Sequence, residues 1–396
     1  MNPNREKICI VTGTRAEYGL LKNLFFLFKD SERFHLQIIA TGMHLSPEFG
    51  LTYKEIEADG LTIDKKVEML LSSDTPSAIA KSMGLATIGF ADALVDLKPD
   101  LLIVLGDRYE ILAAVSAALP FQIPIVHIHG GEKTEGVIDE AIRHSITKMS
   151  LYHFVATEEY KNRVIQLGEN PGRVFVSGGL GVDLIKSLTL FGKEELENRI
   201  QYKFHSKNIL VTFHPVTLEL NSSELQFKEI LLAVSQFLEN NDAGVIFTKA
   251  NSDTNGRVIN RMIDEFVSKN SRSVSFTSMG QLNYFSALQF VDLVLGNSSS
   301  GLLEVPTFGK TSINVGDRQK GRLQAASVIQ AEPTSKSVGE AINRAYSEEF
   351  SRSLENVKNP YGNGGASEFI FKTISSFDFT GMEIKKEFFD IKVENQ

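Results

Sequence analysis

Asp107 and Arg108 stand where a short apolar run ends, and their side chains can transfer protons and bind anions. The run Leu101–Leu105 (LLIVL) is typical of a buried parallel strand, and Gly106 follows it. An acid beside a base is costly to remove from water unless both groups serve a purpose. We therefore predict that Asp107 accepts or donates a proton and that Arg108 clamps an anion.

A second polar cluster follows the apolar run Ile123–Ile128. His129 and Glu132 flank the paired glycines of HIHGGE, which let the backbone approach a ligand closely. Further along, Asp139 and Arg143 are spaced i, i+4 in a predicted helix, so they share one face. Together with Asp107, these residues predict an acid/base pocket in the first half of the chain.

A metal centre is the alternative interpretation of this second cluster. His127 and His129 alternate along a predicted strand, so their side chains point the same way, as two metal ligands would. No HExxH motif and no pair of cysteines accompanies them. We therefore predict a site without a metal.

The segment GNSSSGLLE, residues 296–304, predicts an anion-binding turn. It follows the apolar run Phe290–Leu295 and enters an expected helix, so backbone N–H groups and the helix dipole would face a ligand. Ser298 and Ser299 add hydroxyl groups, and Glu304, a turn further on, could bind the two hydroxyls of a ribose. The alternative is an ordinary strand–helix turn with a serine cap.

Other strand ends carry further polar side chains. Arg15 and Glu17 lie in GTRAEYG, where an arginine suits a diphosphate. This motif does not fit GxGxxG, which argues against a nicotinamide cofactor. His44 follows the next strand as a ligand, a proton shuttle or a structural histidine. The second half, in which we predict a nucleotide-diphosphate pocket, contributes His214 in FHP, Asn251 in ANSD and Arg318 in GDR.

Apolar strands alternate with helices along most of the chain, which predicts an α/β fold with parallel sheets covered on both faces. The alternation restarts after the glycine-rich Ser177–Gly181, which we interpret as a hinge. We expect two doubly wound domains facing a cleft, the first at residues 1–178 and the second at 179–360. A helix at 366–377 should pack back on the first domain, and the tail from Thr380 should be loosely attached. The other expected helices include Pro47–Asp59 and Pro76–Leu97.

The composition is that of a globular protein. The chain has 396 residues, 42% of them hydrophobic, which favours two domains. A net charge of −8 argues against a nucleic-acid groove. The single cysteine, Cys9, lies in an apolar run and fits the core of a protein from a reducing cytosol. The N-terminus shows no signal peptide and no apolar stretch approaches the roughly 20 residues of a membrane span, so we expect a cytoplasmic location.

Over roughly Lys7–Arg322 the chain resembles the bacterial hydrolysing UDP-N-acetylglucosamine 2-epimerases of sialic acid biosynthesis. The motifs that carry the resemblance are TGTRAEYG, TGMHL, GDRYE, HIHGGE, DEAIRHSITKMS, TEEYK, FHP, GNSSSGLLEVP and INVGDRQKGR. The resemblance implies two Rossmann-like domains in the glycosyltransferase-B architecture, a homodimer or homotetramer, and a reaction without a cofactor. A base would remove the C2 proton while UDP leaves C1, and water would add to the 2-acetamidoglycal to give N-acetylmannosamine.

The resemblance also assigns residues. Asp107 and Asp139 match acids implicated in catalysis, His44 an active-site histidine, and Arg143 a residue near the sugar. Some relatives have HIEGGE, so the acid/base role of that glutamate would pass to His129 or Glu132. Some relatives have Asp and Ser in place of Glu17 and Gly19, and the lost hydroxyl removes one possible phosphate contact. The UDP-binding set is matched by Arg15, His214, Asn251, Ser298, Ser299, Glu304 and Arg318.

Several reactions fit these residues. UDP-N-acetylglucosamine is the leading substrate, and UDP-2,4-diacetamido-2,4,6-trideoxyglucose, on the route to legionaminic acid, is the second. A non-hydrolysing epimerase would return UDP to the glycal. A glycosyltransferase of the same architecture would need an acceptor groove for which the sequence shows no segment, and a nucleotide sensor would leave the acids of the first half unexplained.

Overall fold

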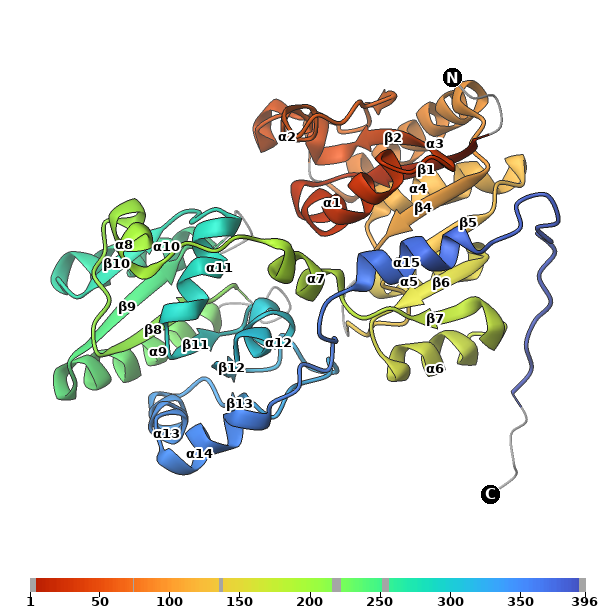
Figure 1. Ribbon diagram of the computed structural model, residues 1–396. Coiled ribbons are helices and arrows are strands. Elements are labelled where there is room, and N and C mark those ends of the chain that lie inside the picture. Colours follow the sequence, from red (N-terminus) through yellow and green to blue (C-terminus); the bar gives the residue numbers. More distant parts are fainter. Residues whose placement is uncertain (1–4, 74, 135–137, 216–221, 251–255, 392–396) are drawn as a thin grey trace. The chain divides into compact units, whose positions relative to one another are not determined.

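The computed structural model describes residues 5–73, 75–134, 138–215, 222–250 and 256–391. The chain divides into two compact units, unit 1 with Met1–Leu184 and Gly364–Gln396, and unit 2 with Ile185–Asn363. Each unit holds one parallel sheet with helices packed on it (Figure 1). The predicted fold class, α/β with two doubly wound Rossmann-like domains, is confirmed. The predicted domain boundaries lay after residues 178 and 360, close to these divisions.

The sheet of unit 1 has the strand order β3-β2-β1-β4-β5-β6-β7, and all its pairs are parallel. The order reverses between β1 and β4, and doubly wound sheets bind ligands at the carboxyl ends of strands at such a point. The strands are β1 (Glu6–Thr12), β2 (Phe34–Thr41), β3 (Lys65–Val67), β4 (Leu101–Leu105), β5 (Ile125–Ile128), β6 (Tyr152–Val155) and β7 (Val174–Val176). The helices are α1 (Arg15–Lys29), η1 (Gly42–Leu45), η2 (Pro47–Phe49), α2 (Tyr53–Ala58), α3 (Pro76–Leu97), α4 (Tyr109–Ala118), η3 (Leu119–Phe121), α5 (Ile138–Met149), α6 (Glu158–Gln166), η4 (Pro171–Arg173) and α15 (Ala366–Ser375), with α7 (Leu180–Ser187) crossing into unit 2.

Side chains of β1 alternate between two apolar layers, one on each face of the unit 1 sheet. Ile8 and Ile10 join the core beneath α1 and α15, whereas Cys9 and Val11 join the core beneath α3 and α4. All four are 0% exposed, and each such burial contributes roughly 1.5–3 kcal/mol for a large aliphatic side chain. The prediction that Cys9 is a core residue is confirmed, and burial raises the pKa of its thiol.

The sheet of unit 2 has the strand order β10-β9-β8-β11-β12-β13, again all parallel. Its order reverses between β8 and β11, so the ends of these two strands form its ligand edge. The strands are β8 (Lys207–Thr212), β9 (Ala243–Thr248), β10 (Ser273–Phe276), β11 (Leu293–Gly296), β12 (Thr311–Val315) and β13 (Val328–Ala331). The helices are α8 (Lys193–Ile200), α9 (Ser222–Asn240), α10 (Gly256–Lys269), α11 (Gln281–Phe290), α12 (Ser300–Leu303), η5 (Val305–Phe308), α13 (Ser335–Ala345), α14 (Glu348–Ser353) and η6 (Leu354–Asn356).

Two local predictions, one about a helix and one about a loop, meet different outcomes. The expected single helix at Pro47–Asp59 is wrong, because Gly50 and Leu51 adopt positive φ angles of 87° and 51° that divide it into η2 and α2. The hinge expected at Ser177–Gly181 stays a prediction: residues 177–179 form a loop, α7 begins at Leu180, and unit 1 ends at Leu184.

Helix α3 has the predicted bounds but contradicts the expectation about apolar stretches. It is 22 residues long and contains an 18-residue window with a mean hydropathy of 1.4, which by length and composition alone suffices to cross a membrane. Its alanines raise the mean hydropathy, although Asp92 and Asp96 interrupt its apolar sequence. Phe90 and Leu94 belong to the unit 1 core, and a core helix passes the same test, so this is weak support for a membrane span.

The chain after Thr380 is attached to unit 1, contrary to the prediction of a loose tail. Lys386 donates to the carboxylate of Glu169 at 2.6 Å and to the carbonyl of Ser150 at 2.6 Å. The backbone N–H of Phe389 donates to the carbonyl of Gly168 at 2.9 Å. Glu169 is 1% exposed, so a buried acid fixes a segment whose own pattern gives no sign of it.

Candidate active site

The carboxyl edge of the unit 1 sheet gathers the side chains predicted for acid/base chemistry. Asp107 and Arg108 lie between β4 and α4, and His129 follows β5 directly. Asp139 and Arg143 lie in the first half of α5. Because β4 and β5 are neighbours in a parallel sheet, the loops that leave them meet at one edge.

Arg143 connects the loops of this edge. Its side chain is 1% exposed and forms an ion pair with Asp107 and another with Glu140, the latter at 2.7 Å. It also donates to the carbonyl of Glu132 at 2.9 Å and to Oγ1 of Thr134 at 2.8 Å. A buried charge is costly unless it is paired and hydrogen-bonded in this way. Arg143 therefore fixes Asp107, and the support that Thr134 and Glu140 provide was not predicted.

Asp139 differs from Asp107 in its surroundings. Burial raises the pKa of Asp139, the negative charge of Asp107 raises it further, and Arg108 and Arg143 oppose the shift. Two neighbouring carboxyl groups in unlike environments are the usual arrangement for an acid and a base at one pH.

His129 is held from both sides of its ring. Its Nδ1 lies 3.1 Å from Oε1 of Glu132, and its Nε2 accepts a hydrogen bond from the N–H of Leu180 at 3.3 Å. The backbone of His129 has φ of +65°, in the left-handed region that non-glycine residues seldom adopt. Such backbone strain concentrates at functional sites. The imidazole of His129 and the carboxylate of Glu132 are thus paired, and either of them is a candidate for the acid/base role.

The geometry of His127 weakens the alternative of a metal site. The side chain is 0% exposed, its Nδ1 lies 3.1 Å from Oγ1 of Thr147, and its Nε2 lies 2.8 Å from the carbonyl of Gly106. Burial lowers the pKa of His127 to about 3, so the ring is neutral. Its two hydrogen bonds link α5 to the loop after β4. Among the described residues, no group of three His, Cys, Asp or Glu side chains could hold a metal ion.

The structure favours the structural alternative for His44. Its ring is 0% exposed and joins Oγ1 of Thr12 at 3.0 Å to Oγ1 of Thr52 at 2.8 Å. Burial lowers the pKa of His44 to about 4, so it is neutral at physiological pH. It ties β1 to the segment before α2.

A buried acid pair lies beneath the first loop of unit 1. Glu17 accepts a hydrogen bond from the N–H of Gly13 at 2.7 Å and so caps the start of α1. Arg108 donates from Nε to Glu110 at 2.5 Å and lies 4.0 Å from Glu17. Burial raises the pKa of Glu17 to about 8, and the charge of Glu110 adds to the shift. Arg15, by contrast, has a 61% exposed side chain, and its Nη1 lies 4.0 Å from the carboxylate of Glu55.

Glu110 is a residue that sequence reasoning missed. It is 1% exposed, and a Cβ atom on Gly13 would lie 2.7 Å from its Cγ. A signal was present in the sequence, because Glu110 shares a helix face with Ala114, on the apolar side of α4.

The predicted anion-binding turn of unit 2 follows β11, but the helix after it is short. Helix α12 has four residues, so a helix dipole contributes little, contrary to the prediction. Within the described residues, the backbone N–H groups of Ser298 and Ser299 donate to no protein acceptor. The prediction of an anion site at this turn therefore rests on these N–H groups and on the serine hydroxyls.

Glu304 belongs to a chain of hydrogen bonds. Oγ of Ser300 donates to its carboxylate, and the hydroxyl of Tyr284 lies 2.8 Å from Oγ of Ser300. Burial raises the pKa of Glu304, and the bond from Ser300 opposes that shift. Tyr284 and Ser300 therefore orient the carboxylate predicted to bind a ribose, and Tyr284 was not predicted.

His214 and Arg318 are brought together through Asn297. The backbone of His214 bonds the side chain of Asn297, and Nη1 of Arg318 donates to the carbonyl of Asn297 at 3.1 Å. The predicted site residue Asn251 lies outside the described residues.

Known proteins match nearly the whole chain. A family model described as UDP-N-acetylglucosamine 2-epimerase matches residues 27–375. A GDP/UDP-N,N′-diacetylbacillosamine 2-epimerase (hydrolyzing) from Campylobacter jejuni is 44% identical, with 88% of this chain and 89% of that protein covered. The polysialic acid biosynthesis protein P7 of Escherichia coli is 39% identical over 98% of both chains. A Neisseria meningitidis UDP-GlcNAc 2-epimerase, solved with UDP-GlcNAc bound, is 20% identical with a TM-score of 0.78, covering 94% of this chain and 100% of that one, and it supports the fold.

The buried Glu17 predicts a pH-dependent stability. The folded protein keeps a proton on Glu17 that the unfolded chain releases near pH 4.5, so this contribution to stability is complete below pH 4.5 and is lost as pH rises towards about 8. Glu17→Gln cannot ionise and retains an acceptor for Gly13. Its free energy of unfolding relative to the unsubstituted protein should rise by at least about 1 kcal/mol between pH 5 and pH 8 in urea titrations. The exposed Glu48→Gln should show no such change, and a pH-independent difference for Glu17→Gln would contradict the prediction.

Proposed function

Because this chain belongs to the UDP-N-acetylglucosamine 2-epimerase family, we propose that it is a hydrolysing 2-epimerase of a UDP-2-acetamido sugar. The products would be UDP and the free 2-epimeric sugar, and no cofactor would take part. The observation that carries the proposal is the pair Asp107 and Asp139, set in unlike environments at the ligand edge of unit 1.

The acids of unit 1 suit the elimination step. The C2 proton of the sugar is barely acidic, so cleavage of the C1–O bond would lead and build positive charge on the ring. Asp107, fixed by Arg143, would remove the C2 proton as the C2–H electrons form the C1–C2 double bond. The C1–O electrons would depart with UDP, and the nearby carboxylates would stabilise the positive charge.

The second step would complete the hydrolysis. Water would add to C1 of the 2-acetamidoglycal while a proton returns to C2 from the opposite face. Asp139, whose raised pKa favours its protonated form, is our candidate for that proton donor, with the pair of His129 and Glu132 as the activator of water.

The edge of unit 2 would bind UDP. The backbone N–H groups of Ser298 and Ser299 donate to no acceptor among the described residues, and they suit a diphosphate, as does the guanidinium of Arg318. Glu304 suits the ribose hydroxyls. Arg15 in unit 1 is a further candidate for the diphosphate.

Two substrates remain candidates for this site. UDP-N-acetylglucosamine, which would give N-acetylmannosamine for sialic acid synthesis, is favoured by the likeness to the polysialic acid biosynthesis protein. UDP-2,4-diacetamido-2,4,6-trideoxyglucose, that is UDP-N,N′-diacetylbacillosamine, is favoured by the relative with 44% identity. The two sugars differ only at C4 and C6, so the proposed chemistry at C1 and C2 is common to both.

Proton NMR in deuterated water tests the reaction and separates the substrates. Each UDP-sugar would be incubated with the protein, and we expect free UDP and a 2-epimeric sugar with deuterium at C2. The sugar nucleotide that turns over faster is the better substrate. An epimerised sugar still attached to UDP would show a non-hydrolysing enzyme, and no reaction with either compound would contradict the proposal.

Asp107→Asn tests the proposed base. We expect turnover to fall by about 10²–10⁴-fold, because the amide cannot accept the C2 proton, while the affinity for UDP stays within about twofold. Glu140→Gln is the matched control, since it removes another ion-pair partner of Arg143, and its turnover should fall far less. Unchanged turnover in Asp107→Asn would exclude this residue as the base.

We also expect the protein to self-associate. Helix α3 exposes Leu85, Ile88 and Val95 at 45%, 65% and 53%, and an apolar stripe of this kind favours burial against a second copy. Ile88→Lys should therefore lower the mass measured by light scattering during size-exclusion chromatography. Leu225→Lys, a similarly exposed leucine on α9, should not change the mass. A monomeric unsubstituted protein would contradict this expectation.

A further inference from the structure

Asn297 is completely buried, and every one of its polar groups is hydrogen-bonded. Its Oδ1 accepts from the N–H of His214 at 2.7 Å, and its Nδ2 donates to the carbonyl of His214 at 2.8 Å. Its own N–H donates to the carbonyl of Thr212 at 3.2 Å. Its carbonyl accepts from Arg318 at 3.1 Å and from Nε2 of Gln319 at 2.9 Å.

These bonds join three separate loops of the unit 2 edge. His214 follows β8, Asn297 follows β11, and Arg318 follows β12. Gly296 makes the close approach possible, because a Cβ atom there would lie 1.9 Å from the carbonyl oxygen of Thr212. A buried amide with all its bonds made stabilises one arrangement, whereas an unmet bond at a 0% exposed site is costly.

We propose that Asn297 is the positioning residue of the UDP pocket, holding the His214 and Arg318 loops in their binding arrangement before the nucleotide arrives. Asn297 has no exposed atoms to offer a ligand, so it acts through these two neighbours. A pocket that is already formed binds more tightly than one that must be ordered on binding. The inference rests on the proposed function, since it assigns the role of Asn297 to the binding of UDP.

The same sheet offers a matched control at the amino ends of its strands. Asn208, 3% exposed at the start of β8, accepts from the N–H of His205 at 2.9 Å and donates to the carbonyl of His205 at 2.8 Å. It also bonds Asp292, the residue before β11, with its own backbone N–H and carbonyl. Asn208 therefore joins the beginnings of β8 and β11 as Asn297 joins their ends.

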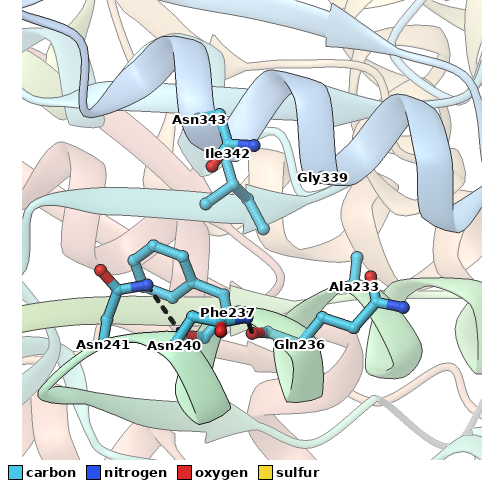
Figure 2. A pocket seen from close by; sticks show the side chains of 8 residues that line it. All are labelled: Ala233, Gln236, Phe237, Asn240, Asn241, Gly339, Ile342 and Asn343. Carbon is cyan, nitrogen blue, oxygen red and sulfur yellow. Dashed lines mark hydrogen bonds between the residues drawn. The ribbon is translucent and has the colours of Figure 1, made fainter.

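The edge that holds Asn208 carries none of the residues predicted to bind UDP. A hollow of about 200 Å³ lies there between α9 and α13, lined by amide side chains (Figure 2). Asn240 and Asn241 in this hollow donate to carbonyls of α9, and Asn241 also accepts from Lys207 at the start of β8. A loss of stability that originates at this edge should leave the UDP pocket as it is.

The test compares Asn297→Ala with Asn208→Ala in the full chain. The affinity for UDP would be measured by calorimetry, and the melting temperature of each variant by differential scanning calorimetry. We expect both substitutions to lower the melting temperature, but only Asn297→Ala to weaken UDP binding, by about tenfold or more, as the competent arrangement becomes a minor population. With the better sugar nucleotide, KM should rise in Asn297→Ala by more than kcat falls.

Each result decides between the proposals. Unchanged UDP affinity in Asn297→Ala, or an equal loss in Asn208→Ala, would overturn the positioning role while leaving the proposed function intact. An unsubstituted protein that does not bind UDP would overturn both. If the alanine variants do not fold, Asn297→Ser and Asn208→Ser provide the same comparison, because serine is too short to bond both groups of a histidine backbone.

Discussion

A parallel strand covered by helices on both faces can present polar groups to a ligand only where it ends. Both sheets of this protein obey that constraint, and each places its reversal of strand order at the polar loops, between β1 and β4 in unit 1 and between β8 and β11 in unit 2. The interior of each sheet is therefore apolar and generic, while chemistry is confined to a few residues past the strand ends.

The two edges meet the electrostatic demands of their sites in different ways. Unit 1 relies on ion pairs, one between Arg143 and Asp107 and one between Arg108 and Glu110. Charges of this kind would suit the proton transfer and the developing cation of the proposed reaction. Unit 2 relies mainly on neutral groups, such as the amide of Asn297. The proposed diphosphate ligand would bring its own charge, so backbone N–H groups and an arginine would suffice to bind it.

The placement of these polar residues was predictable from the sequence, because an apolar run that ends in Gly-Asp-Arg or in Gly-Asn-Ser marks a strand end without any tertiary information. The supporting partners were not predictable. Thr134 and Glu140 become hydrogen-bond partners of Arg143 only when α5 lies against the loop after β5. In the sequence, Asn297 is indistinguishable from the other polar residues of a serine-rich turn. The division between η2 and α2 was hidden for a different reason, since Leu51 adopts a positive φ angle that its side chain does not favour. The attachment of the C-terminal tail depends on Glu169, a buried acid far away in the sequence.

The left-handed backbone of His129 constrains how this enzyme can change over evolutionary time. Histidine, asparagine and aspartate tolerate positive φ angles better than most side chains do, whereas glutamate has no such advantage. A glutamate at this position, which the resemblance implies for some relatives, would be less suited to the strained conformation than the histidine of this chain. An exchange between the two forms would require compensating changes around Leu180 and Glu132, which hold the ring from either side. Position 129 should therefore vary in concert with its neighbours, and lineages with one form would be separated from those with the other by less stable intermediates.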